Sequence, residues 1–197
     1  MYLIPSSAFE TINNYSSNKD KTVLRGFTQL RVAINGQIFP RVPKKQQGKA
    51  AKATRVALGL GKPAEIAFTN DEMKVYNVDG EVARTERIED FEFVQFGALR
   101  TFPFQFGSML FVPSYTYSLT LVVGVGTRHY YILNPNFTVF QLLAPILKEK
   151  GIKIEDPFDI ADLPSDSKRE NYFNKFYEKR AEGTTYPIQA KWVPLLV

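Results

Sequence analysis

The sequence predicts a mainly β protein of the α+β class: an antiparallel meander or partly open barrel of about seven strands, capped by a C-terminal helix. Three observations predict it. Short alternating polar and apolar segments follow one another from Glu65 to Leu133, turn residues separate them, and an amphipathic helical pattern comes directly afterwards. Hydrophobic residues make up 44% of the 197-residue chain, which is enough for a packed core.

Residues 1–62 are expected to form a basic N-terminal extension that contains a hairpin. Pro5 and the serines after it allow a short helix within residues 5–17, which the sequence leaves open. Residues 26–39 read GFTQLRVAINGQIF, and the dipeptide Asn35-Gly36 suits a two-residue turn with positive φ. We therefore predict a hairpin around this dipeptide.

Residues 63–151 are expected to form the main domain. Four β-type runs, EIAFT, MKVYNV, EVARTERI and DFEFVQF, lie between residues 65 and 96, with turn residues at Asn70-Asp71-Glu72 and at Asp79-Gly80. Two or three more strands are expected in FQFGSMLFV, YTYSLTLVVGVG and TRHYYILN. Residues 101–127 carry no charge, but Pro103, Pro113 and several polar residues favour paired strands over a membrane helix.

A capping helix is predicted over residues 137–151, FTVFQLLAPILKEKG, because its apolar residues recur with helical spacing. Lys148 and Lys150 suit the last turn, and Gly151 is a typical stop signal. Pro145 lies inside the pattern, so we expect it to kink or shorten the helix.

Residues 152–197 are expected to form an acidic linker, a second helix and an apolar end. The helix is predicted in SKRENYFNKFYEKRAE, where four aromatic residues share one face as a core or docking stripe. The apolar end is expected to pack back on the domain or on a partner. The residues that could dock a partner are Tyr172, Phe173, Phe176, Tyr177 and Trp192.

The order of the elements Glu65–Phe96, Phe104–Leu133 and Phe137–Lys150 resembles the pleckstrin-homology-like architecture, including its bacterial members. The resemblance covers residues 65–150 and implies two orthogonal sheets with a helix at one open corner. Eukaryotic members often bind phosphoinositide headgroups through basic residues between the first two strands. Here that loop is Asn70-Asp71-Glu72, which is acidic, so the resemblance implies a binding scaffold more than a lipid site.

Charge is distributed unevenly along the chain. Residues 1–62 contain eleven basic and two acidic residues, a net charge of +9, whereas the remainder contains fourteen and eighteen, a net charge of −4. The segment RVPKKQQGKAAKATR is the centre of the basic region, and a helix would align most of its cations in one stripe. It lacks the apolar face of a membrane-surface helix and has no aromatic residue of its own for stacking bases. The candidate polyanion-binding residues are Arg41, Lys44, Lys45, Lys49, Lys52 and Arg55.

Candidates for catalysis are few. The chain has no cysteine, which suits a cytoplasmic location, and its one histidine, His129, is interpreted as a strand residue with a local hydrogen-bond partner. The glycines of GVGTRH and GLGKP lack the spacing of a nucleotide-binding loop. The carboxylates of ERIEDFE are interpreted as a solvated face. We expect no metal, no cofactor and no secretory signal.

These observations favour a non-catalytic interaction or scaffold module that engages a protein partner or a second copy of itself. The alternative is binding of nucleic acid or an anionic phosphate, lipid headgroups included, through residues 41–55. An enzyme that uses carboxylates is the third hypothesis, and the residue inventory makes it the weakest.

Overall fold

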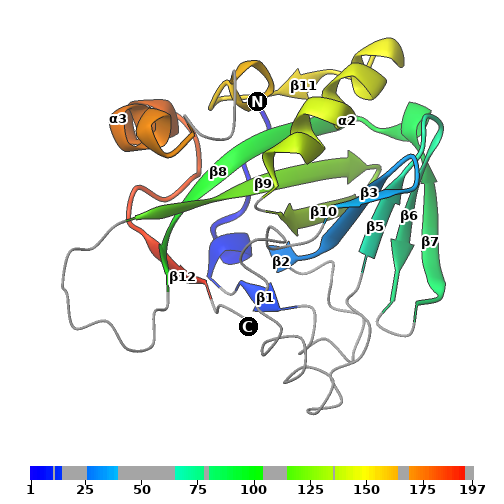
Figure 1. Ribbon diagram of the computed structural model, residues 1–197, viewed down its shortest axis with the longest axis horizontal. Helices are drawn as coiled ribbons and strands as arrows, with labels where there is room; N and C mark the ends of the chain where they lie inside the picture. Colours follow the sequence, from blue (N-terminus) through cyan, green and yellow to red (C-terminus); the bar gives the residue numbers. More distant parts are fainter. Residues whose placement is uncertain are drawn as a thin grey trace.

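The computed structural model describes residues 1–10, 12–14, 26–39, 65–77, 80–103, 115–134, 136–163 and 169–193, without the side chains at positions 13, 14, 103, 192 and 193. The strands of these residues form two sheets, with two α-helices beside them (Figure 1). Residues 41–55, the predicted polyanion-binding segment, lie outside the described residues.

The larger sheet is built around three long antiparallel strands: β8 (Phe93–Pro103), β9 (Thr116–Val125) and β10 (Arg128–Leu133). Short strands extend it in parallel on both sides. On the β10 side lie β2 (Thr28–Gln29) and then β1 (Asn13–Asn14). Along β8 lie β11 (Ile154–Glu155) and β12 (Lys191–Val193), which pair with its two ends.

The smaller sheet has the order β4-β3-β5-β6-β7. Its strands are β3 (Arg31–Ile34), β4 (Gln37–Phe39), β5 (Glu65–Phe68), β6 (Glu72–Tyr76) and β7 (Val82–Arg87). The predicted hairpin is present, because β3 and β4 are antiparallel and Asn35 and Gly36 between them have φ values of 48° and 80°. β3 pairs in parallel with β5, so this hairpin belongs to the same sheet as the strands from Glu65 onward.

One residue carries the chain from one sheet to the other. Leu30 is fully buried between β2 of the larger sheet and β3 of the smaller sheet. The buried side chain of Asn134 fastens this corner, since its amide nitrogen donates to the Leu30 carbonyl oxygen at 3.0 Å and its Oδ1 accepts from the Asn136 nitrogen at 2.8 Å. Strands that change sheets in this way make the corners of orthogonal packings.

The predicted capping helix is α2 (Phe137–Glu149). Asn136 begins it by accepting from the Thr138 nitrogen, and Gly151 ends it with a φ of 72° in a Schellman motif. Of the two effects expected of Pro145, a kink or a shorter helix, the shortening does not occur. The helix continues to Glu149 because Pro145 and Gln141, whose carbonyl loses its helical donor, are both exposed to water.

Among the described residues, the remaining helical elements are α3 (Arg169–Ala181) and the short 3₁₀ turns η1 (Ser6–Phe9), η5 (Ile88–Asp90) and η6 (Ile160–Asp162). No helix in the described part of the chain has the length and apolar character needed to cross a membrane.

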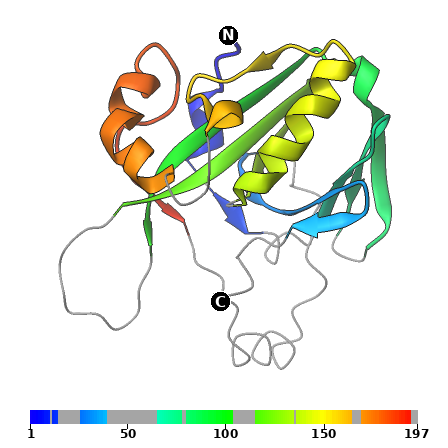
Figure 2. The same ribbon diagram turned by 45° about the horizontal axis from the view of Figure 1, so that its top comes forward.

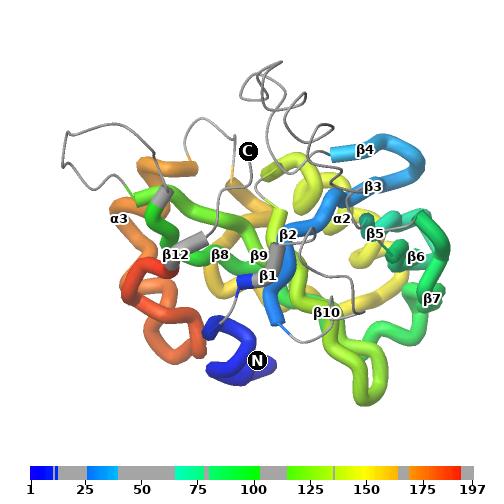
Figure 3. Tube along the Cα trace, turned by 90° about the horizontal axis from the view of Figure 1, so that it is seen from below, coloured from blue at the N-terminus to red at the C-terminus, as the bar shows by residue number. Residues whose placement is uncertain are grey.

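The two faces of the larger sheet are covered by different parts of the chain. Phe96 of β8 packs edge-to-face on Phe140 of α2, with ring centroids 5.1 Å apart, and α2 lies in front of the long strands in Figure 2. The neighbouring residue Gln95 faces the other way and contacts Tyr2 in the N-terminal segment, which runs along that side of the strands (Figure 3). Buried residues from both sheets and both helices form one core.

The prediction of a mainly β chain with two helices is confirmed, with two open sheets. β8 extends through residues 97–103, which were not expected to be in a strand, and the strand predicted at residues 104–112 lies outside the described residues. The sheets combine strands from all three predicted segments, 1–62, 63–151 and 152–197. The division into these segments stays a prediction.

Candidate functional site

α3 is held on the protein by one row of its side chains. Phe173, Tyr177 and Ala181 lie four residues apart and are buried. The Phe173 ring packs on Tyr117 of β9 at 5.0 Å, and the Tyr177 ring packs on Phe158 at 5.4 Å. The inner side of α3 is therefore part of the core.

The Tyr177 hydroxyl also fills a gap along the edge of β8. β11 pairs with residues 94–95 and β12 with residues 101–103, which leaves the stretch between them without a partner strand among the described residues. The Tyr177 oxygen accepts from the Arg100 backbone nitrogen at 3.2 Å and lies 3.3 Å from the Ala98 carbonyl oxygen. Burial raises the pKa of Tyr177 to about 12, so the hydroxyl keeps its proton at neutral pH.

Arg100 strengthens the same attachment. Its guanidinium carbon lies 4.8 Å from the ring centroids of both Tyr115 and Tyr177, and its Nη1 donates to Glu178 of α3 at 3.0 Å. Burial works against the charge, but hydrogen bonds with Glu178 and Tyr117 outweigh it and raise the pKa of Arg100 above its usual value. Glu178 thus forms an ion pair with a residue of β8, although its own side chain is largely exposed.

The outer side of α3 presents aromatic rings that are only half-buried. Tyr172 and Phe176 lie one turn apart, with ring centroids 5.1 Å apart. Lys175 Nζ lies 5.1 Å from the Phe176 ring centroid, and Lys179 is exposed one turn further along. At 100° per residue these four side chains fall within an arc of about 100°. We call Tyr172, Lys175, Phe176 and Lys179 the α3 strip.

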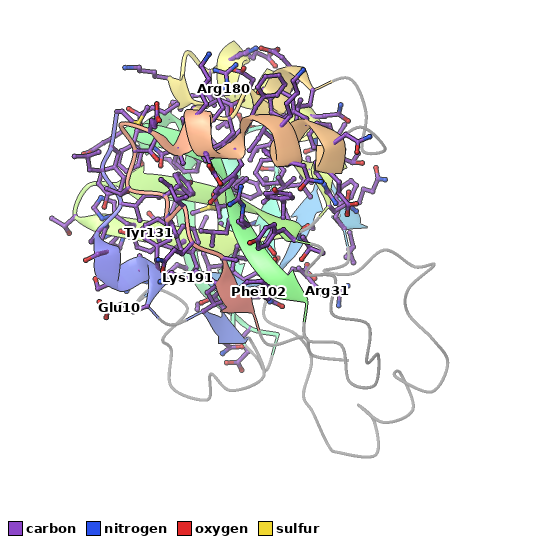
Figure 4. All side chains as sticks on the ribbon, turned by 90° about the vertical axis from the view of Figure 1, so that its left-hand side faces the viewer. Glu10, Arg31, Phe102, Tyr131, Arg180 and Lys191 are labelled. Atoms are coloured by element: carbon purple, nitrogen blue, oxygen red, sulfur yellow. The ribbon has the colours of Figure 1, made fainter. Side chains whose placement is uncertain are left out.

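One flank of the strip is fixed by an acidic turn of the chain itself. Asp156 builds this turn, because its carboxylate accepts from the backbone nitrogens of Ile160 and Ala161 at 2.9 and 2.8 Å. Asp159 in the same turn accepts from the Tyr172 hydroxyl at 3.2 Å and forms an ion pair with Arg180, which Figure 4 shows on α3. The positions of Tyr172 and Arg180 are therefore set by Asp159.

The predicted docking residues divide into three groups in the structure. Phe173 and Tyr177 are in the core, whereas Tyr172 and Phe176 reach solvent. For Trp192 the structure describes the backbone alone, which pairs with Phe102 through β12; Figure 4 shows Phe102 beside Lys191 at this end of β8. The polyanion candidates at residues 41–55 are outside the described residues.

His129 lies in β10, as predicted for a strand residue, and its hydrogen-bond partner comes from the distant N-terminal segment. Its Nδ1 lies 3.3 Å from the Tyr2 hydroxyl, which also contacts the Tyr131 hydroxyl at 2.9 Å. Burial, together with the hydrogen bond to Tyr2, raises the pKa of Tyr131 far above its usual value. His129 and Tyr131 share one face of β10, and this face is covered by the N-terminal segment.

Glu86 is a buried charge that the sequence interpretation missed. It was expected on a solvated face, but it is 7% exposed and joins β7 of one sheet to β10 of the other. Arg128 donates to its two oxygens at 3.0 and 2.9 Å, and Tyr130 donates a hydrogen bond to Oε1. Burial and the neighbouring Glu86 raise the pKa of Tyr130 to about 12. Glu86 contacts the face of β10 that carries Arg128 and Tyr130, whereas His129 is on the opposite face.

Within the described ranges, no three or more carboxylate and histidine side chains are grouped as metal ligands would be. No family model, no curated protein and no solved structure matches the chain. The α3 strip combines half-buried aromatic rings with exposed lysines, and the functional proposal rests on it.

Proposed function

We propose that this chain is a non-catalytic interaction module that binds a protein partner through the α3 strip. The observation that carries the proposal is the pair of half-buried rings, Tyr172 and Phe176, on the outer side of a helix whose inner side is built into the core.

The composition and the rigidity of the strip support this proposal. Aromatic side chains supply much of the binding energy in protein interfaces, and they do so best where little conformational freedom is lost on binding. Tyr172 is held by Asp159, and Phe176 lies between Tyr172 and the Lys175 ammonium group. The helix that carries them is anchored by Tyr177 and Arg100. A partner would therefore meet a surface that is already ordered.

We also propose that the scaffold is pleckstrin-homology-like and that it acts in the cytoplasm. The first part is supported by the packing of α2 against Phe96 in the larger sheet, whose long strands β8, β9 and β10 follow β5, β6 and β7 of the smaller sheet along the chain. The lack of cysteine is compatible with the second. Both parts are secondary to the binding proposal.

Site-specific photocrosslinking in cells tests the proposal. Benzoylphenylalanine in place of Phe176 is expected to give a discrete protein adduct, either with another protein or with a second copy of the chain. The matched control places it at Val82, an exposed residue of β7 that is 51% accessible. Identical adducts from both positions, or none from position 176, would contradict a docking role for the α3 strip.

A second candidate function is binding of nucleic acid or an anionic phosphate through residues 41–55. The net charge of +9 on residues 1–62, against −4 on the remainder, favours it. Binding to heparin or to single-stranded DNA should then weaken steeply with salt and when Lys44, Lys45, Lys49 and Lys52 are all changed to Gln. Binding that is insensitive to both changes would rule this function out.

A further inference from the structure

The two cations of the α3 strip have no carboxylate partner among the described residues. The ion pairs of the described chain include neither Lys175 nor Lys179. Glu178, which is on the same helix, is held by Arg100. The lysines lie one turn apart and flank the two rings, so the strip combines positive charge with apolar surface.

The opposite flank of the strip already binds a carboxylate. Asp159 comes from a turn with several acidic residues, and it is engaged by the Tyr172 hydroxyl and by Arg180. The aromatic rings of the strip are thus bordered by cations on both sides. One side is neutralised by the chain itself and the other, at Lys175 and Lys179, is not.

The ring geometry disfavours single-stranded nucleic acid as the ligand. Bases stack on open aromatic faces, but the Lys175 ammonium lies over the Phe176 ring and Tyr172 is tilted by 46° against it. A base that stacked on this face of Phe176 would compete with the ammonium for it. An acidic side chain would instead pair with that ammonium while its apolar neighbour meets the edge of the rings.

We infer that the partner segment recognised by the α3 strip is an acidic peptide that carries apolar residues among its carboxylates. This inference rests on the proposed function and names the chemistry of its partner. Lys175 and Lys179 pair with the carboxylates, and Tyr172 and Phe176 contact the apolar residues. Charge complementarity of this kind sets specificity and the rate of encounter.

Fluorescence anisotropy with three labelled probes tests the inference on the full chain. The probes are a peptide of glutamate, alanine and phenylalanine, the same peptide with glutamine for glutamate, and an oligothymidylate. The glutamate peptide should bind most tightly and should weaken as salt is raised. The double variant Lys175→Gln/Lys179→Gln should bind it about tenfold more weakly. Lys148→Gln/Lys153→Gln, which removes two exposed lysines elsewhere, should bind like the parent chain.

The outcomes separate this inference from the proposed function. Both peptides could bind equally well, with binding lost in Phe176→Ala but unchanged in the double lysine variant. That result would overturn the acidic partner and keep the docking surface. Peptide binding that needs neither Phe176 nor the lysines would overturn both. Binding of the oligothymidylate alone, with loss in the Lys175→Gln/Lys179→Gln variant, would reassign the strip to nucleic acid.

Discussion

Tyr186 lies so close to Gly97 that any side chain at position 97 would force the Tyr186 ring to move. A Cβ atom on Gly97 would lie 1.9 Å from the Tyr186 hydroxyl oxygen and 2.2 Å from its Cζ. The hydroxyl oxygen is 2.7 Å from Thr120 Oγ1 on the adjacent strand, and Tyr186 is buried. A glycine within β8 thus lets the segment after α3 close over the sheet.

Gly97→Ala is expected to lower the free energy of unfolding by about 1–3 kcal/mol, because a buried ring must move to make room. Urea titration measures this change. Tyr186→Leu removes the ring that the new methyl group would meet, and it lowers the free energy of unfolding by itself. The double variant should therefore lose less stability than the sum of the two single variants. Strictly additive losses would show that the two residues are not in contact.

Tyr177→Phe removes the hydroxyl that takes the place of a strand along β8. The Arg100 nitrogen would lose its acceptor in a buried setting. We expect a loss of about 1–3 kcal/mol in the free energy of unfolding, measured by urea titration. Tyr172→Phe is the matched control, because its hydroxyl contacts Asp159 near the surface and should change stability by less than about 1 kcal/mol. Equal losses in the two variants would contradict the role given to Tyr177.

The cross-sheet ion pair of Glu86 predicts a loss of stability in acid. Burial opposes its ionisation, but hydrogen bonds from Arg128 and Tyr130 and the Arg128 charge outweigh this and lower the pKa of Glu86 below 4.5. A carboxylate with a lowered folded pKa stabilises the protein above its unfolded pKa, and this contribution disappears as pH falls through the folded pKa. The stabilisation should be complete near neutral pH and should decline as the pH falls below 4.5 and through the lowered folded pKa.

Comparison with Glu86→Gln isolates the pH dependence due to Glu86 from that of the other carboxylates. One of these is Asp156, and burial raises its pKa. The parent chain should be more stable than the variant near pH 7, and the difference should shrink as the pH is lowered. Urea titrations across the acid range measure it. A difference that stays constant with pH would mean that Glu86 does not gain its stabilisation as a carboxylate.

Local features were predicted well from the sequence because their causes are local. The turn at Asn35-Gly36 needs residues that accept positive φ, and the end of α2 needs Gly151. The aromatic residues of α3 were assigned to one face from helical spacing alone. Helical spacing alone could not tell which of these rings are buried. Phe173 and Tyr177 are buried, whereas Tyr172 and Phe176 reach solvent. The difference depends on where the helix meets β8 and β9.

Features that depend on distant parts of the chain could not be predicted. Glu86 looked like a surface carboxylate because Arg128 and Tyr130, its partners, are more than forty residues away in the sequence. The parallel pairing of β3 with β5 and the change of sheet at Leu30 likewise follow from the tertiary fold. No periodicity or turn signal encodes them.

Two adjacent turns of α3 provide a last test, because they separate the core role from the docking role. Phe173→Ala should lower the free energy of unfolding by about 3–5 kcal/mol, since the ring is fully buried against Tyr117 and Phe158. Phe176→Ser should change it less, since the ring is only partly buried. Urea titration measures stability, and the crosslinking or peptide assay measures binding. We expect Phe176→Ser to lose binding while it stays folded. A large loss of stability in Phe176→Ser would instead place that ring in the core and leave the α3 strip without its central contact.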